Sequence, residues 1–458
     1  MSNSLTTDAD TIVAIATAPG RGGVGVIRIS GASLDGLLPA LCDRPIEPRR
    51  AVHCRFLDQD GRAIDEGIAL YFRAPASFTG EDVVELQGHG GPVVMDMLVR
   101  RVLALGARLA RPGEFSERAF LNGKLDLVQA EAVADLIAAD SEAAARGAMR
   151  SLQGEFSRHV HALTDELVSL RVWVEATLDF PDEELGDIED VDPLLARLDA
   201  LLVAFESLRA SVRQGVILRD GIRVAIAGRP NAGKSRLLNA LSGQETAIVT
   251  EIPGTTRDVL RETIHLEGIP VHMVDTAGLR ASDDQIEAEG IRRARREIER
   301  ADCVLLVIDS ARERVTAEID SLIAEEFAAC SENGRLTLVL NKADLSGLPV
   351  GKVEGPAPTL VVSASTGAGL DSLRAHLISQ ARGDSASTAE FLGRRRHLAA
   401  LDAAEAHVER ARSCARVQGL ELLAEELRQA QRELGAISGT FTTEDLLGEI
   451  FSEFCIGK

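Results

Sequence analysis

The chain has 458 residues, of which 71 are acidic and 50 are basic, so its formal net charge is −21. This length exceeds what one ordinary core fills and predicts two to four domains. The negative charge excludes strong non-specific binding to a polyanion unless local basic patches or a basic partner provide the contacts. No apolar run is long enough to span a bilayer, and no basic and then apolar leader opens the chain. The sequence therefore predicts a cytoplasmic chain without a membrane partner.

Six cysteines are scattered along the sequence, and none has a close neighbour of its own kind (Cys42, Cys54, Cys303, Cys330, Cys414, Cys455). This spacing argues against a zinc site and against a disulfide framework, so reduced thiols are expected. Five of them are interpreted as small apolar residues. Cys455 differs, because it stands in the terminal sequence Cys-Ile-Gly-Lys, where packing alone predicts nothing so specific.

Residues 1–122 contain short β-rich runs separated by Gly and Pro turns, a pattern that indicates an α+β module. The expected strands cover residues 11–17, 24–29, 67–72 and 82–86. A glycine-rich stretch at residues 19–25 is followed by no clear helix. It is therefore interpreted as a turn and not as a dinucleotide-binding fingerprint.

Residues 123–217 and 382–458 are predicted to form one all-α domain that is interrupted by the segment between them. Apolar residues in these parts recur at alternating steps of three and four, as on one face of a helix. Asp192 and Pro193 provide an N-cap and a first-turn proline. The stripes are interpreted as core and comprise Phe156, Val160, Leu163, Leu167, Leu170, Val174, Leu178, Leu194, Leu198, Leu201, Phe205, Leu208, Val212, Leu423, Leu427, Ala430, Leu434 and Ile437.

The interrupting segment, residues 218–381, begins with a phosphate-binding motif. An apolar strand at residues 222–227 leads into Gly-Arg-Pro-Asn-Ala-Gly-Lys-Ser, a complete P-loop, and a helix is predicted directly after it. Backbone N–H groups at a helix N-terminus suit phosphate oxygens. Lys234 is expected to contact the β and γ phosphates, and Ser235 to place its hydroxyl on Mg²⁺.

Three more motifs follow predicted strand ends: Asp275-Thr276-Ala277-Gly278, Asn341-Lys342-Ala343-Asp344 and Ser363-Ala364-Ser365. Ligands bind beyond the carboxyl ends of the strands in open parallel sheets, so these motifs predict one site in an α/β domain. The Asp344 carboxylate matches the ring N–H and exocyclic amine of guanine, which indicates a guanine-nucleotide phosphohydrolase. Asn341 is expected at the opposite edge of the base, the Lys342 stem over its face, and the backbone at Ala364 near its carbonyl oxygen. Asp275 is expected to hold the magnesium ion through water.

The residue that follows the Asp-x-x-Gly motif is Leu279, where well-known GTPases place a water-orienting glutamine. A leucine cannot orient water, so hydrolysis is either very slow or another group has this role. Acidic residues downstream are candidates, although each is also explained as a solvated surface charge (Asp283, Asp284, Glu287, Glu289). Residues 250–258 occupy the switch I position, and Thr255 or Thr256 is expected to complete the magnesium shell.

Seven motifs are distributed along the chain: Arg-Gly-Gly-Val-Gly at residues 21–25, Phe-Thr-Gly-Glu-Asp at 78–82, Gly-His-Gly-Gly-Pro at 88–92, Pro-Gly-Glu-Phe-Ser at 112–116, Gly-Thr-Thr-Arg-Asp at 254–258, the P-loop, and the terminal Cys-Ile-Gly-Lys. Together they resemble the tRNA-modification GTPase family MnmE, also called TrmE. The match runs from one end of the chain to the other. It implies a multidomain protein with a folate-binding-like N-terminal domain at 1–122, a helical domain at 123–217 and 382–458, and an inserted P-loop G domain at 218–381.

The resemblance also implies functional residues. The water-orienting catalytic carboxylate falls on Glu287. The family's Mg²⁺ ligands fall on Ser235 and Thr256, and its K⁺ ligands on Asn231, Thr250, Ile252 and Thr255. Its folate contacts fall on Arg28, Glu85 and Lys124, with Lys458 near the same pocket. The expected GTP-binding set is Asn231, Ala232, Gly233, Lys234, Ser235, Arg236, Thr250, Glu251, Ile252, Pro253, Gly254, Thr255, Thr256, Asp275, Thr276, Ala277, Gly278, Asn341, Lys342, Ala343, Asp344, Ser363, Ala364 and Ser365.

The activity implied by the resemblance is potassium-dependent GTP hydrolysis coupled to tRNA modification. A homodimer joined through its N-terminal domains is expected, and it forms a heterotetramer with the flavoprotein MnmG. The complex adds an aminomethyl or carboxymethylaminomethyl group to C5 of the wobble uridine, position 34, of certain tRNAs. The one-carbon donor is 5,10-methylenetetrahydrofolate, of which 5-formyltetrahydrofolate is an analogue.

Two other functions remain open from the residues. A ribosome-assembly regulatory GTPase would carry a related G domain without modification chemistry, but helices stand here in place of its C-terminal RNA-binding module. A dimeric membrane-remodelling GTPase would also insert a G domain in a helical stalk. No exposed apolar or polybasic segment favours that second alternative.

Overall fold

The computed structural model describes residues 10–179, 192–243, 261–275, 295–311, 323–324, 327–382, 390–416, 419–440, 444–452, 454–455 and 457. The chain divides into two compact units. The first comprises residues 1–138, 148–207 and 399–458, and the second comprises residues 139–147 and 208–398. Among the described helices, none combines the length and the apolar character needed to cross a membrane.

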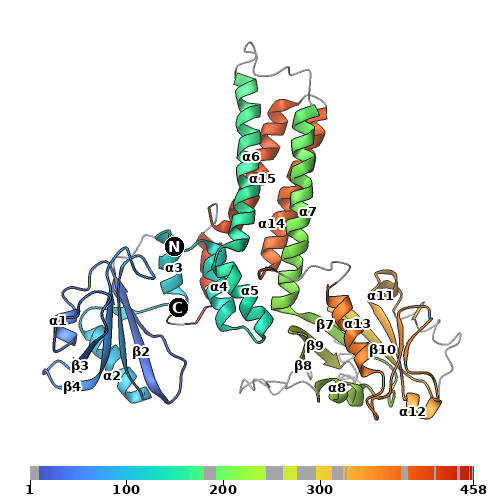
Figure 1. Ribbon diagram of the computed structural model, residues 1–458, viewed down its shortest axis with the longest axis horizontal. Helices are drawn as coiled ribbons and strands as arrows, with labels where there is room; N and C mark the ends of the chain where they lie inside the picture. Colours follow the sequence, from blue (N-terminus) through green and yellow to red (C-terminus); the bar gives the residue numbers. More distant parts are fainter. Residues whose placement is uncertain are drawn as a thin grey trace, which may run out of the picture. The chain divides into compact units, whose positions relative to one another are not determined.

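The first unit opens with a six-stranded sheet in the order β3-β4-β5-β2-β1-β6 (Figure 1). The neighbours are antiparallel except for β1 and β6, which are parallel. The strands are β1 Ile12–Ile15, β2 Gly22–Gly31, β3 Val52–Leu57, β4 Ala63–Phe72, β5 Asp82–Gly90 and β6 Arg108–Leu109. The α+β prediction for this region is therefore confirmed.

The side-chain alternation of the central strands decides which residues form the core. Ile27 and Ile29 on β2 face the same side as Leu86 on β5, and all three are fully buried under helix α2, Pro92–Ala104. Period-two alternation sends the intervening residues to the other face. Arg28 and Glu85 are such residues, and they lie directly opposite each other in the pairing of β2 with β5.

Helices make up the rest of the first unit, and the predicted apolar stripes form their core. Phe156, Leu167 and Leu198 are completely buried, as are Leu427 and Leu434. Every other residue of the predicted stripes is buried, and Leu178 is half-buried. The helices are α1 Leu38–Leu41, α3 Glu114–Leu121, α4 Leu127–Ile137, α5 Glu142–Leu152, α6 Glu155–Asp179, α7 Asp192–Asp220, α14 Arg395–Arg416, α15 Leu420–Ser438 and α16 Glu444–Ser452, of which α5, α7 and α14 extend into the second unit.

Four long helices, α6, α7, α14 and α15, form a bundle in which each helix makes polar contacts with two others. Arg171 of α6 bonds Gln431 of α15, and Arg197 of α7 bonds Glu166 of α6. Arg412 of α14 pairs with Asp199 of α7, and His407 of α14 bonds Glu426 of α15. Segments more than 200 residues apart in the sequence thus belong to one core, as the interrupted helical pattern predicts.

The second unit contains a seven-stranded sheet in the order β12-β13-β11-β10-β7-β9-β8, in which only the edge strands β12 and β8 are antiparallel to their neighbours. Its strands are β7 Ile222–Ala227, β8 Arg261–Leu266, β9 Ile269–Asp275, β10 Cys303–Asp309, β11 Leu336–Asn341, β12 Gly351–Val353 and β13 Thr359–Val361. Its short helices are α8 Lys234–Ser242, α11 Ala328–Glu332, α12 Ala343–Ser346 and α13 Leu370–Arg382.

Two hydrophobic clusters cover the two faces of this sheet. Leu237 of α8 and Leu373 of α13 pack with Ile226 in one cluster. Cys330 of α11 packs with Leu306 in the other. The arrangement is the three-layer α/β fold expected for a P-loop G domain, with parallel central strands buried on both faces.

Candidate functional site

The predicted nucleotide motifs all stand at the carboxyl ends of neighbouring parallel strands. The P-loop follows β7, and β9 ends at Asp275, which the register places beside Ile226. Strands β10 and β11 end side by side, with Asp309 opposite Asn341. Residues 363–365 follow β13, the other neighbour of β11. One edge of the sheet therefore gathers the motifs that the sequence places more than 100 residues apart.

The P-loop backbone requires glycine at two positions. Gly228 has φ +139°, and an added Cβ would lie 2.2 Å from the carbonyl oxygen of Val307. Gly233 has φ +94°, and its Cβ would lie 2.3 Å from Nδ2 of Asn341. Any side chain would therefore push the loop away from the strands that position it. The buried Lys234 ammonium donates to the Gly228 and Arg229 carbonyls at 2.7 and 2.8 Å, which holds it across the loop.

Asn341 connects the P-loop to the loop at residues 363–365. Its Nδ2 donates to the Ala232 carbonyl, and its Oδ1 accepts from the backbone N–H of Ala364, both at 3.0 Å. The side chain is 2% exposed. The sequence predicts that this amide faces an edge of the base. In the structure, both ends of the amide bond to backbone, so Asn341 braces two loops against each other.

Asp344 is exposed at the same edge, and two serines act on its carboxylate. The Ser363 hydroxyl donates to Oδ1 at 2.6 Å and lies 2.9 Å from the Ser365 hydroxyl. Hydrogen bonds from Ser363 and then Ser365 lower the pKa of Asp344. The carboxylate is therefore ionised at neutral pH and points into solvent where a base can reach it. Such a group can accept two hydrogen bonds from one ring edge.

Asp309 is a site residue that the sequence analysis did not single out. Its Oδ2 accepts from Nζ of Lys342 at 2.6 Å, and the Asp309 side chain is 9% exposed against 28% for the lysine. Lys342 itself has φ +67°. The ion pair therefore directs a lysine stem that starts from an unusual backbone conformation. No motif signals this pairing, because the two residues are 33 positions apart.

Several predicted residues lie outside the described residues, namely Thr250, Glu251, Ile252, Pro253, Gly254, Thr255, Thr256, Thr276, Ala277, Gly278, Glu287 and Lys458. For Asp275 the structure describes the backbone alone. Asn231, Ser235 and Arg236 are exposed around the loop. Asn231 adopts φ +67°, a left-handed conformation that asparagine tolerates better than most residues.

A separate cavity of about 510 Å³ lies in the N-terminal sheet domain. Its wall contains the predicted residues Glu85 and Lys124 together with residues that were not predicted (Arg49, Phe72, Ala76, Ser77, Phe78, Val83). Arg28 borders it, because its guanidinium bonds Oε1 of Glu85 at 3.0 Å through Nε and at 2.9 Å through Nη2. The Arg28 guanidinium also lies 5.4 Å from the Phe78 ring centroid, within cation–π range.

The carboxyl-terminal tail reaches this same region. The Gly457 carbonyl accepts from Nη1 of Arg28 at 3.5 Å. Gly457 has φ +99°, and an added Cβ would lie 2.5 Å from the carbonyl of Ile15. Cys455 is exposed, and its carbonyl accepts from the N–H of Gly113 at 3.4 Å. Close backbone packing therefore explains the glycine in the terminal motif.

Fold and site together define a P-loop GTPase domain, because the P-loop and the motifs that follow the ends of β9, β11 and β13 converge on one edge of a parallel sheet. Comparison with known families narrows the class. The MnmE helical domain model matches residues 127–455, and the model of the GTP-binding protein TrmE N-terminus matches residues 11–124. The chain therefore belongs to the tRNA modification GTPase MnmE family, and it is an enzyme of the GTP hydrolase class.

Curated relatives agree over nearly the whole chain. The tRNA modification GTPase MnmE of Methylococcus capsulatus is 56% identical over 452 residues, 98% of this chain and 99% of the relative. Those of Pseudomonas aeruginosa and Azoarcus sp. are also 56% identical, each over 98% of this chain and over 99% and 98% of the relative. The solved G domain of the FeoB iron transporter of T. maritima is 26% identical over 35% of this chain and 98% of its own, with a TM-score of 0.25, too low to add to the assignment.

Proposed function

We propose that this GTPase is activated by potassium and that, with the flavoprotein MnmG, it adds an aminomethyl or carboxymethylaminomethyl group to C5 of the wobble uridine of certain tRNAs. A tetrahydrofolate supplies the one-carbon unit. The observation that supports the assignment most strongly is the pairing of two sites in one chain of this family. One is a guanine-nucleotide edge organised around Asp344, and the other is a cavity with folate-compatible chemistry around Glu85.

In the proposed GTPase site, the P-loop binds the phosphates and Asp344 selects guanine. Ser235 and Thr256 would ligate Mg²⁺, and Asn231, Thr250, Ile252 and Thr255 would ligate K⁺. A monovalent cation beside the phosphates has the same electrostatic effect as an arginine finger, since both neutralise charge that develops in the transition state. Glu287 would orient the attacking water in place of Leu279.

The donor set of the N-terminal cavity fits a folate. The Glu85 carboxylate can accept from the amino-pyrimidine edge of a pterin, and the phenyl rings of Phe72 and Phe78 suit its aromatic parts. Lys124 and Arg49 are cations that can pair with the glutamate tail. When bound, the folate would supply a carbon at the oxidation level of formaldehyde. The residues of this chain would bind and orient it, and the tail contacts Arg28 beside the cavity through the Gly457 carbonyl.

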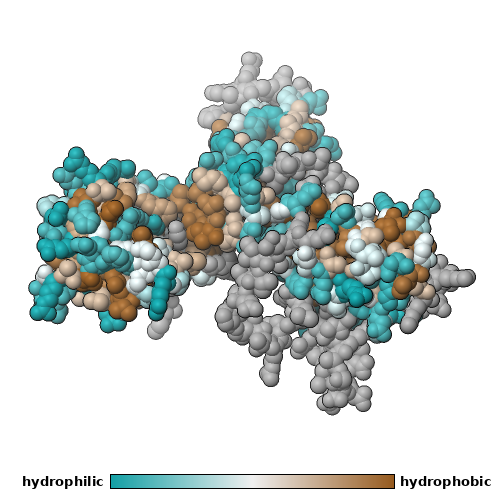
Figure 2. Space-filling view, turned by 60° about the horizontal axis from the view of Figure 1, so that its bottom comes forward, coloured by the Kyte–Doolittle hydropathy of each residue, from teal (hydrophilic) through white to brown (hydrophobic). Residues whose placement is uncertain are grey.

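The proposed homodimer would use the N-terminal sheet domain. Apolar areas interrupt the hydrophilic surface of this domain, at the left of Figure 2. Its exposed apolar side chains include Val24, Leu109 and Ile68, at 62%, 59% and 38% exposure. Exposed apolar surface of this kind is typical of protein contacts.

Two measurements test the proposal. GTP turnover of the full chain is compared in KCl and NaCl at equal ionic strength, and faster turnover in KCl is expected. Equal rates would refute potassium activation. The Glu287→Ala variant should bind GTP normally and hydrolyse it about a hundredfold more slowly, as expected for loss of the group that positions the attacking water. Retained hydrolysis would move the catalytic role to another residue.

The modification chemistry is tested by nucleoside analysis of tRNA from cells that lack this chain. The wobble uridines of the affected tRNAs should lose their C5 substituent, and expression of the chain should restore it. Intact wobble nucleosides would refute the modification function and favour a GTPase that regulates another RNA process.

A further inference from the structure

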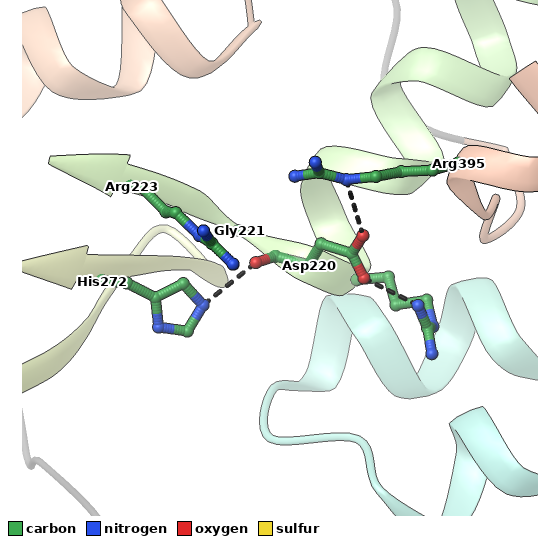
Figure 3. Close-up of a pocket in the computed structure, with 6 residues that line it drawn as sticks. Asp220, Gly221, Arg223, His272 and Arg395 are labelled. Atoms are coloured by element: carbon green, nitrogen blue, oxygen red, sulfur yellow. Dashed lines mark hydrogen bonds and ion pairs between the residues drawn. The ribbon is translucent and has the colours of Figure 1, made fainter. Parts of the chain in front are cut away.

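A cavity of about 500 Å³ lies in the second unit at the start of strand β7 (Figure 3). Residues 219–221 directly precede this strand, whereas the P-loop follows its last residue, Ala227. The cavity is therefore at the opposite end of the strand from the nucleotide motifs. Its lining consists of Arg219, Asp220, Gly221, Arg223, His272 and Arg395.

The lining of this cavity carries a net positive charge, whereas the chain as a whole carries a net negative charge. It contains three arginines and one carboxylate, in a chain with 71 acidic and 50 basic residues. Arg395 is also the middle residue of three consecutive arginines, residues 394–396. One further acid faces the area, because the Asp302 carboxylate accepts from the backbone N–H of Arg223 at 2.8 Å. The arginines still outnumber these two carboxylates.

Asp220 organises two of the guanidinium groups instead of neutralising the cavity. Its Oδ1 accepts from Nη1 of Arg219 at 2.7 Å, and its Oδ2 lies 3.6 Å from Nε of Arg395 (Figure 3). The Arg395 side chain is 70% exposed, and Arg223 is exposed as well. A planar guanidinium matches phosphate oxygens in two-point contacts.

The backbone under these side chains is fixed. His272 donates from Nε2 to the Asp220 carbonyl at 3.0 Å, so its Nδ1 accepts from the Thr263 hydroxyl, also at 3.0 Å. Gly221 has φ +68°, and an added Cβ would lie 2.1 Å from the carbonyl of Pro270. The turn from α7 into β7 thus accepts only glycine. A site built on fixed backbone loses less conformational entropy when it binds a ligand.

We propose that this cavity is a phosphate-binding subsite for the backbone of the tRNA. The inference rests on the proposed function, in which a tRNA is the substrate. A chain of charge −21 repels a polyanion, so contact with RNA requires a local surface of the opposite sign. Phosphate contacts of this kind position an RNA without reading its sequence. The subsite would therefore serve every tRNA that the enzyme accepts.

The test compares the full-length wild type with the double variant Arg223→Gln/Arg395→Gln, each assembled with MnmG. Binding of a tRNA transcript is followed by fluorescence anisotropy at several salt concentrations. The double variant should bind about tenfold more weakly, and the slope of log affinity against log salt should fall by roughly one to two. GTP turnover should not change. The charge-preserving variant Arg223→Lys/Arg395→Lys should keep the salt slope of the wild type and lose only part of the affinity, because lysine keeps the charge but not the two-point contact. Lys352→Gln, an exposed cation of β12 outside the cavity, serves as the control and should bind as the wild type does.

Each alternative result overturns the subsite. Unchanged tRNA affinity and salt slope in the double variant would do so. Loss of MnmG binding with intact tRNA binding would identify the cavity as a protein contact. If the wild type modifies tRNA and the double variant has the same KM for tRNA, the subsite is refuted and the proposed function stands. Absence of modification by the wild type itself would refute both.

Discussion

Replacing Asp309 with asparagine isolates the charge that positions Lys342. The substitution keeps the shape of the side chain but removes the carboxylate that holds the lysine ammonium at 2.6 Å. A hydrogen bond to a charged group contributes about 1.5–3 kcal/mol. Since the lysine is 28% exposed, solvent screening reduces this to about 1–2 kcal/mol. We therefore expect Asp309→Asn to weaken GTP binding by roughly 5- to 30-fold.

Titration with a fluorescent guanine nucleotide measures this effect. Because Lys342 is expected to lie against the base, GDP affinity should fall by the same factor as GTP affinity. Asp371→Asn provides the control, since Asp371 pairs with Arg374 but is 99% exposed. It should leave affinity and melting temperature unchanged. A folded Asp309→Asn protein with wild-type affinity for both nucleotides would refute the positioning role.

Two further predictions concern the N-terminal domain. Gly457→Ala should detach the tail from β1, because the new Cβ would lie 2.5 Å from the Ile15 carbonyl oxygen. Folate binding should therefore weaken while GTP turnover stays normal. Normal folate binding by this variant would contradict the packing of the tail. Glu114→Gln should lower the melting temperature at neutral pH. Burial raises the pKa of Glu114, but hydrogen bonds from Arg108 and the Arg111 N–H outweigh burial and lower the pKa overall. The ionised group therefore stabilises the fold above its unfolded pKa, and this contribution disappears as pH falls through the lowered value. The difference between variant and wild type should shrink on acidification, and a constant difference would exclude the ionised carboxylate as the cause.

The G domain and the helical core could be predicted well because their patterns are local. Strand β7 occupies the predicted residues 222–227, and the helical stripes are buried. A P-loop specifies strand, loop and helix in one short segment. Likewise, a period of three to four residues reports one buried face of a helix without knowledge of its partner.

The remaining features depend on contacts between distant segments. Asp309 meets Lys342 only because β10 and β11 pair in parallel register. Strand β3 was not predicted, and the bridge between Cys42 and Phe56 brings Cys42 against Cys54. The hydrogen bond with Cys54 and burial raise the pKa of the Cys42 thiol. Cys42 and Cys54, which the sequence separates by a turn and part of β3, are thus neighbours in the fold.

The folate-compatible cavity shows the same limit. The family resemblance predicts Glu85 and Lys124, and Phe78 belongs to one of the motifs that carry it, whereas Arg49 and Phe72 have no sequence signal of their own. The pairing of β4 with β5 places Phe72 near Glu85, and Arg49 and Lys124 reach the turn between these strands through the carbonyls of Ala76 and Pro75. Alternation along a strand predicts which face a residue occupies, but not which loop covers that face.

The most direct test of the account is the nucleotide preference of Asp344→Asn. An asparagine cannot accept two hydrogen bonds from guanine, but its amide can donate to the extra carbonyl of xanthine. We expect GTP affinity to fall about tenfold or more and xanthosine triphosphate to become the preferred nucleotide. Undiminished GTP affinity in a folded Asp344→Asn protein would contradict the claim that this single carboxylate selects the base.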